Sequence, residues 1–177
     1  MIVVADTGPV NYLILSRHIG LIPPLYGSLI LPPAVHRELL HPKAPPDVRR
    51  WASELPAWAE VRPPKDASRF AELRPGEREA ISLALEAKAD VLLIDETEGR
   101  ETAVANGVRV KGILGVLEEA AEKRLVNLPE AITKLRATNI FLADDVVQEV
   151  LRRHHERATN RQQAPQHEID HDQEIER

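Results

Sequence analysis

Five short, largely apolar runs separated by helical segments constrain this chain more than any other feature. The runs lie at residues 2–5, 28–31, 59–62, 90–95 and 108–110. Between them apolar residues recur at helical spacing, most clearly in RPGEREAISLALEAKA. Strands that alternate with helices form βαβ units, and right-handed crossovers place helices on both faces of the sheet. The sequence therefore predicts an α/β fold around a central, mostly parallel sheet.

Composition divides the chain into a globular body and a polar tail. Hydrophobic residues make up 43% of the 177 residues, enough for one domain with a substantial core. We place this domain at residues 1–157. Residues 158–177 are almost free of apolar side chains, so we expect a disordered or loosely helical tail.

Charge and residue usage narrow the functional classes. The net charge is −5, which does not favour non-specific binding to a duplex, and the absence of cysteine excludes thiol chemistry. Aromatic residues are only 3% of the chain, which argues against extended stacking platforms for single strands. No run reaches the roughly 20 apolar residues of a membrane span, and we see no secretory signal. We expect a cytoplasmic protein that does not enter the membrane.

The first strand ends in the tripeptide Asp6-Thr7-Gly8, a pattern also found in aspartic proteases. Those enzymes need two such aspartates, whereas this chain has one, followed by a proline and a helical pattern. Asp6 instead follows the carboxyl end of a buried strand, where open α/β sheets place their ligand sites. The alternative is that Asp6 or Thr7 only caps the next helix.

Asp95 repeats this arrangement at the end of the apolar run 90–94. If the two strands are neighbours, Asp6 and Asp95 converge at one edge of the sheet. The alternative is a capping box, in which Asp95 caps the next helix and Glu98 reaches back.

Glu77 lies on the apolar face of its helix when residues are placed at roughly 100° intervals. Glu79 falls on the far side, together with Ser82 and Glu86. A buried carboxylate is costly unless it is paired, and a cation would pair it. The alternative is an acid in the first helical turn, which the helix dipole favours. The apolar stripe consists of Ala80, Ile81, Ala84 and Ala87.

Glu38 is the fourth acid, on a short helix after the strand at 28–31 and two prolines. It borders the apolar stripe of that helix, and the alternative is a solvated glutamate. Mg²⁺ and Mn²⁺ prefer such groups of carboxylate oxygens. Two ions about 4 Å apart activate water and stabilise the leaving oxygen of a phosphodiester.

Four segments resemble the PIN domain, and in particular the VapC-like PIN proteins of type II toxin–antitoxin systems. The segments are VVADTGPV, LPPAVHREL, RPGEREAISLALE and DVLLIDETEGRETAVANGVRVKGILGVL, and the resemblance covers about residues 1–155. It implies a three-layer α/β/α sandwich and an endoribonuclease, a hydrolase that cleaves RNA with Mg²⁺ or Mn²⁺. It also implies a toxin that forms homodimers and is blocked by a small antitoxin protein.

The resemblance also assigns roles to individual residues. The third acid is a glutamate here, whereas an aspartate is usual in the family. Thr7 would add a hydroxyl beside the metal, Glu98 a water-mediated contact and Arg100 a phosphate contact. The four acids that would hold the metal and support catalysis are, in order, Asp6, Glu38, Glu77 and Asp95.

Two other functions are compatible with parts of this pattern. A catalytically inactive PIN-like module would bind RNA or a protein partner without cutting. A Rossmann-like nucleotide binder is disfavoured because no glycine-rich turn follows the first strand. We therefore expect a metal-dependent ribonuclease, with the inactive module as the alternative.

Overall fold

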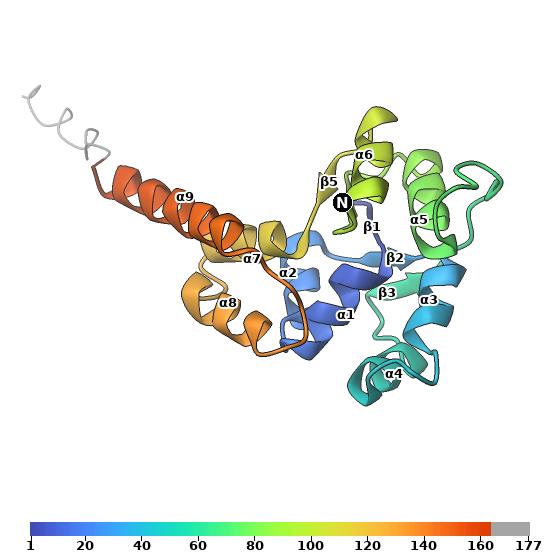
Figure 1. Ribbon diagram of the computed structural model, residues 1–177, viewed down its shortest axis with the longest axis horizontal. Coiled ribbons are helices and arrows are strands. Elements are labelled where there is room, and N and C mark those ends of the chain that lie inside the picture. Colours follow the sequence, from blue (N-terminus) through green and yellow to red (C-terminus); the bar gives the residue numbers. More distant parts are fainter. Residues whose placement is uncertain (164–177) are drawn as a thin grey trace, which may run out of the picture.

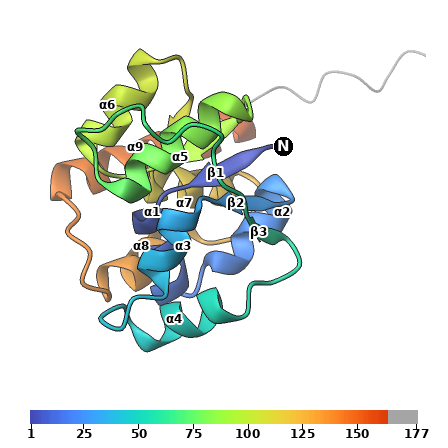
Figure 2. The same ribbon diagram turned by 90° about the vertical axis from the view of Figure 1, so that its right-hand side faces the viewer.

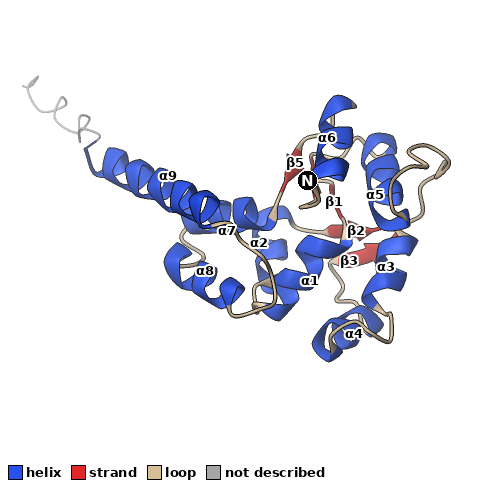
Figure 3. Cartoon of the chain, viewed as in Figure 1, coloured by secondary structure: helices blue, strands red, loops and turns tan. Residues whose placement is uncertain are grey.

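The computed structural model describes residues 1–163, which form a five-stranded parallel sheet with helices on both faces (Figure 1, Figure 3). The order of the strands across the sheet is β3-β2-β1-β4-β5. All five predicted strands are present. They are β1 (Val3–Ala5), β2 (Leu29–Leu31), β3 (Ala59–Val61), β4 (Val91–Leu93) and β5 (Val110–Lys111).

Helices follow the strands along the chain, and several of them begin at a proline. Pro33, Pro46 and Pro75 each open a helix, where the missing N–H and fixed φ of proline cause no loss. The helices on the N-terminal side are α1 (Thr7–Leu15), η1 (Ile19–Leu21), α2 (Ile22–Tyr26), α3 (Pro33–Leu39) and α4 (Pro46–Ser53). The later helices are α5 (Pro75–Glu86), α6 (Thr97–Ala105), α7 (Ile113–Glu122), α8 (Leu128–Arg136) and α9 (Asp144–Gln163).

The sheet separates two hydrophobic cores. Val3 and Ala5 point into the first core, whereas Val4 points into the second, as the alternation of side chains along a strand requires. The first core contains side chains from α1 to α4 and α7 to α9, and the second contains side chains from α5 and α6. Figure 2 shows α5 and α6 on one side of the strands, with α4 and α8 on the other. The predicted three-layer α/β/α arrangement is confirmed.

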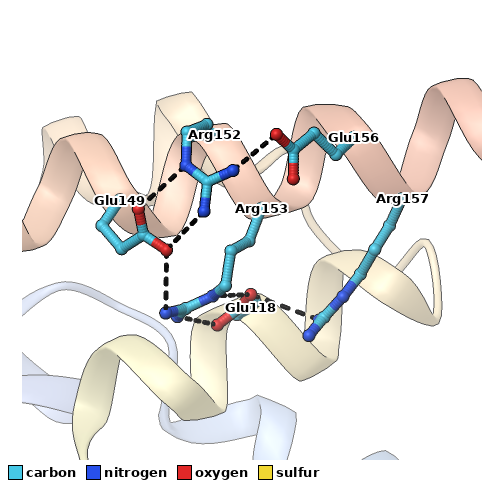
Figure 4. Close-up of polar contacts among 6 residues, drawn as sticks. All are labelled: Glu118, Glu149, Arg152, Arg153, Glu156 and Arg157. Atoms are coloured by element: carbon cyan, nitrogen blue, oxygen red, sulfur yellow. Dashed lines mark hydrogen bonds and ion pairs between the residues drawn. The ribbon is translucent and has the colours of Figure 1, made fainter.

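An ion-pair network fastens α9 to α7 (Figure 4). Glu118 of α7 is buried, and it accepts hydrogen bonds from Arg153 at 2.9 Å and from Arg157 at 3.2 Å. Burial alone would raise the pKa of Glu118, but the two guanidinium groups outweigh it and lower the pKa. Along α9 itself, Arg152 pairs with Glu149 on one side and with Glu156 on the other.

Helix α9 is longer than expected and projects from the body (Figure 1). We predicted a helix over residues 143–157, but it continues to Gln163. Residues 158–163 are therefore helical, and the rest of the predicted tail, 164–177, lies outside the described residues. In the part of the chain that is described, no helix combines the length and hydropathy of a membrane span.

Candidate active site

Strands β1 and β4 are direct neighbours, and they bring Asp6 and Asp95 to the same edge of the sheet. Ala5 lies opposite Leu93, and the Asp6 N–H donates to the Leu93 carbonyl at 2.9 Å. Asp6 is only 5% exposed. It occupies the N-cap position of α1, but its carboxylate makes no capping hydrogen bond. Helix capping therefore does not account for this buried acid.

Glu38 reaches Asp6 across a glycine at the start of α5. A Cβ atom at Gly76 would lie 2.8 Å from Glu38 Oε1 and 3.1 Å from Asp6 Oδ1. The two carboxylates therefore meet over the bare backbone of this buried residue. The Thr7 hydroxyl donates a hydrogen bond to Glu38 Oε2 and orients it.

Glu77 is buried on the inner face of α5, as its helical position predicted. It is 7% exposed and packs beside α6, where a Cβ atom at Gly99 would lie 3.5 Å from Glu77 Cγ. Burial is the main cause that raises the pKa of Glu77. The charges of Glu96, Glu98 and Glu38 raise it further, and the neighbouring Arg74 lowers it in part.

Asp95 turns its carboxyl group toward the start of α7. Its Oδ1 accepts a hydrogen bond from the Ile113 N–H at 2.9 Å, and a Cβ atom at Gly112 would lie 2.6 Å from this oxygen. Asp95 is exposed as a whole residue, but the protein atoms packed around its carboxyl group raise the pKa of Asp95, while the Ile113 N–H and Arg100 oppose the shift. The capping-box alternative is wrong, because Glu96 is the N-cap of α6 and no side chain makes a capping hydrogen bond there.

The pKa of Asp6 links the four acids into one cluster. It is raised to about 7, mainly by burial, and the charges of Glu38, Glu77 and Asp95 raise it further. The Thr7 N–H lowers it in part. Three carboxylates, from α3, from α5 and from the end of β4, therefore all raise the pKa of the Asp6 carboxyl group. Asp6 and Glu77 are buried, whereas Glu38 and Asp95 are exposed. Like charges around a buried carboxylate are unfavourable without a cation.

Comparison with known families agrees with this geometry. A family model described as "DUF3368: PIN domain" matches residues 2–156, which is most of the chain. The chain belongs to the PIN domain family. PIN domains are generally nucleases and typically use divalent metal ions, so the chain has a nuclease fold. Neither the curated proteins nor the solved structures contain a significant match.

Asp6, Glu38, Glu77 and Asp95 have the oxygen donors that a hard divalent cation prefers, but they do not lie close enough together to coordinate one ion. Among residues 1–160, no three acidic, histidine or cysteine side chains stand close enough together to hold one ion. Glu38 and Asp95 are each directed by a protein donor, and like charges repel. The all-oxygen donor set, with carboxylate oxygens of Glu38 and Asp6 both lying against Gly76, nevertheless suits Mg²⁺ or Mn²⁺.

The three secondary residues occupy different positions around this cluster. Thr7 contacts Glu38, as described above. Glu98 is exposed in the first turn of α6, and its charge acts on Glu77. Arg100 is half-buried and donates from Nη1 to the Ile94 carbonyl at 2.8 Å, so it supports the backbone just before Asp95. Its phosphate contact stays a prediction.

A groove of about 870 Å³ opens beside Asp95. Its walls are the start of α7, the segment 140–143 and the near side of α9. Asp95 and Arg100 line one part of it, whereas Phe141, which is 89% exposed, and Val146 line another. Of the four acids, Asp95 is the one that lines this groove.

Sequence reasoning missed the glycines and misplaced Glu79. Gly76 and Gly112 leave room for the neighbouring carboxylates. The sequence offers only a weak indication of this, because Gly76 stands beside the candidate acid Glu77 and Gly112 stands at the start of a helix.

Glu79 was expected on the far side of α5 with Ser82 and Glu86. The prediction is wrong for Glu79 and for Ser82, which is 2% exposed, whereas Glu86 is exposed as expected. Only 15% of the Glu79 side chain is exposed, and it accepts a hydrogen bond from the Ala34 N–H of α3.

Proposed function

We propose that this PIN domain is a Mg²⁺- or Mn²⁺-dependent endoribonuclease. The observation that carries the proposal is Asp6, a 5% exposed acid whose pKa is raised to about 7 by burial and by three further carboxylates. A protein keeps such a cluster at a cost in stability, and a divalent cation offsets that cost. Family membership supports the same conclusion, because PIN domains are generally metal-using nucleases.

The residues that would hold the metal are Asp6, Glu38, Glu77 and Asp95. A bound divalent ion would make water a stronger nucleophile and stabilise the leaving oxygen of the phosphodiester. The protein's part is to position the acids. Asp6 and Glu77 are fixed by burial, the Thr7 hydroxyl orients Glu38, and the Ile113 N–H orients Asp95.

RNA is the substrate class we propose. The groove beside Asp95 offers a surface along which a single strand would lie, with Arg100 close to the acids. The net charge of −5 favours a substrate held at a metal over one held by a broad basic surface.

We further propose that the protein is a cytoplasmic toxin, forms a homodimer and is neutralised by a small antitoxin. An arginine side chain inserted among four carboxylates would be a physically effective inhibitor, because it replaces the cation. Expression of the wild-type chain should arrest growth, whereas the Asp6→Asn variant should not. Sedimentation of the purified chain tests the dimer.

A catalytically inactive module is the second candidate, and the incomplete ligand shell favours it. In that case the chain would bind RNA or a protein partner without a metal. Calorimetric titration with Mn²⁺ separates the two candidates, since only the nuclease should bind the ion.

The decisive assay is RNA cleavage in Mn²⁺ with and without a chelator. We expect Asp6→Asn to reduce cleavage at least about a hundredfold, as loss of a catalytic group does. Glu86→Gln changes an exposed acid at the far end of α5 and should leave the rate unchanged. Equal cleavage by wild type and Asp6→Asn would refute the proposed function.

A further inference from the structure

Helix α3 lacks an N-terminal cap from its own segment. It begins at Pro33, and its N-cap residue is Pro32, whose side chain cannot accept a hydrogen bond. Ala34 therefore has the first N–H group of the helix, and this residue is only 2% exposed. A buried N–H without an acceptor is costly, so an acceptor must come from elsewhere.

Glu79 of α5 supplies that acceptor. Its Oε2 accepts a hydrogen bond from the Ala34 N–H at 2.8 Å, and its Oε1 lies 3.7 Å from Arg37 Nη2. The side chain of Glu79 is 15% exposed and that of Arg37 is 67% exposed. The hydrogen bond is therefore the stronger of the two contacts, because an exposed ion pair contributes little. A carboxylate at this position also interacts favourably with the helix dipole.

The same two helices meet again at the acidic cluster. Glu79 contacts the first turn of α3, whereas Gly76, three residues earlier on α5, lies against Glu38 in the last turn of α3. The two helices therefore run in opposite directions, with one contact near each end of α3. A shift of α3 along α5 would move Glu38 away from Asp6.

We propose that Glu79 is a positioning residue for the metal site. By capping α3 from α5, it holds Glu38 opposite Asp6 without itself touching the ion. This inference rests on the proposed function, because it assigns Glu79 a role in a site that binds a divalent cation. It predicts that Glu79 affects metal affinity through a hydrogen bond acceptor rather than through its charge.

Calorimetric titration with Mn²⁺ tests this prediction on the full chain. Glu79→Ala should weaken Mn²⁺ binding about tenfold, which is the usual effect of losing a hydrogen bond that supports a metal ligand without touching the metal. Glu79→Gln should bind within about threefold of wild type, because its amide oxygen still accepts from Ala34. Arg37→Ala, which removes only the ion pair, should bind as wild type does.

Glu86→Ala is the matched control. Glu86 lies on the same helix and accepts hydrogen bonds from the Lys65 and Asp66 N–H groups, at 2.7 and 2.9 Å. Its loss removes contacts of the same kind far from the site, so Mn²⁺ affinity should be unchanged. If Glu79→Ala fails to fold, Glu79→Met keeps the side-chain length without a strong acceptor and replaces it.

Amide hydrogen exchange of Ala34 in the metal-free protein provides a second readout. Exchange should accelerate in Glu79→Ala and stay slow in Glu79→Gln. Mn²⁺ binding by Glu79→Ala that equals the wild type, with Ala34 deprotected, would overturn the inference and leave the proposed function standing. Failure of the wild type itself to bind Mn²⁺ would overturn both.

Discussion

Asp6→Asn should stabilise the metal-free protein, although it abolishes the proposed activity. The pKa of Asp6 rises from 3.8 to about 7 on folding, so the folded state binds the proton more tightly than the unfolded state. The stability that this group contributes is therefore fully present below pH 3.8 and is lost as the pH rises to about 7. At pH 8 the ionised carboxylate destabilises the fold by at most roughly 4 kcal/mol, at about 1.4 kcal/mol per pKa unit.

Urea unfolding in a chelating buffer measures this effect. The free energy of unfolding of Asp6→Asn should exceed that of the wild type at pH 8, and the difference should shrink by about 2 kcal/mol at pH 5.5. Asp47→Asn, at an exposed position on α4, should change stability by less than about 0.5 kcal/mol at both values. Saturating Mn²⁺ should stabilise the wild type far more than Asp6→Asn.

An Asp6→Asn variant that is no more stable than the wild type at pH 8 would contradict this prediction. A difference in stability between the two proteins that does not change with pH would contradict it equally. In either case Asp6 would not be under electrostatic stress in the folded state, and the argument for a cation would lose its physical basis.

Three further predictions concern the glycine, the proton and α9. Gly76→Ala should weaken Mn²⁺ binding at least about tenfold in a calorimetric titration, because its Cβ would lie 2.8 Å from Glu38 Oε1. Gly20→Ala is the control: its Cβ would meet open space, so it should bind Mn²⁺ as the wild type does. Mn²⁺ affinity should rise about tenfold between pH 6 and pH 8, because the proton on Asp6 stops competing with the ion. Calorimetry in two buffers of different ionisation enthalpy should detect the released proton. An Mn²⁺ affinity that does not change with pH would contradict this prediction. Glu118→Ala should lower the free energy of unfolding by about 1–2 kcal/mol, because it leaves two half-exposed arginines without their partner. A thermal melt measures this change, and an unchanged melting temperature would mean that the network does not stabilise the fold.

The sequence predicted the five strands because their signal, a short apolar run, is local. The run at 28–31 ends at two prolines, whereas Asp6 and Asp95 stand directly at the ends of two other runs. The inward direction of Glu77 was also predictable, since helical periodicity places it among apolar residues. What the sequence did not contain was the neighbour relation of β1 and β4, which only the topology established.

The errors arose where a distant segment supplied the partner. Periodicity placed Glu79 on the far side of α5, but α3 packs on that side and presents the Ala34 N–H to it. Asp95 had a suitable local capping partner, yet its carboxylate accepts from Ile113, 18 residues later. Helix α9 was predicted too short because Ala158 is the only apolar residue among 158–163, so no apolar stripe indicated a helix there.

The most direct test of the central claim is a crystal structure of the wild-type protein soaked in Mn²⁺, with anomalous scattering recorded at the manganese edge. The account predicts an anomalous peak enclosed by carboxylate oxygens of Asp6, Glu38, Glu77 and Asp95. A well-ordered cluster without such a peak, or manganese bound only elsewhere on the molecule, would contradict it.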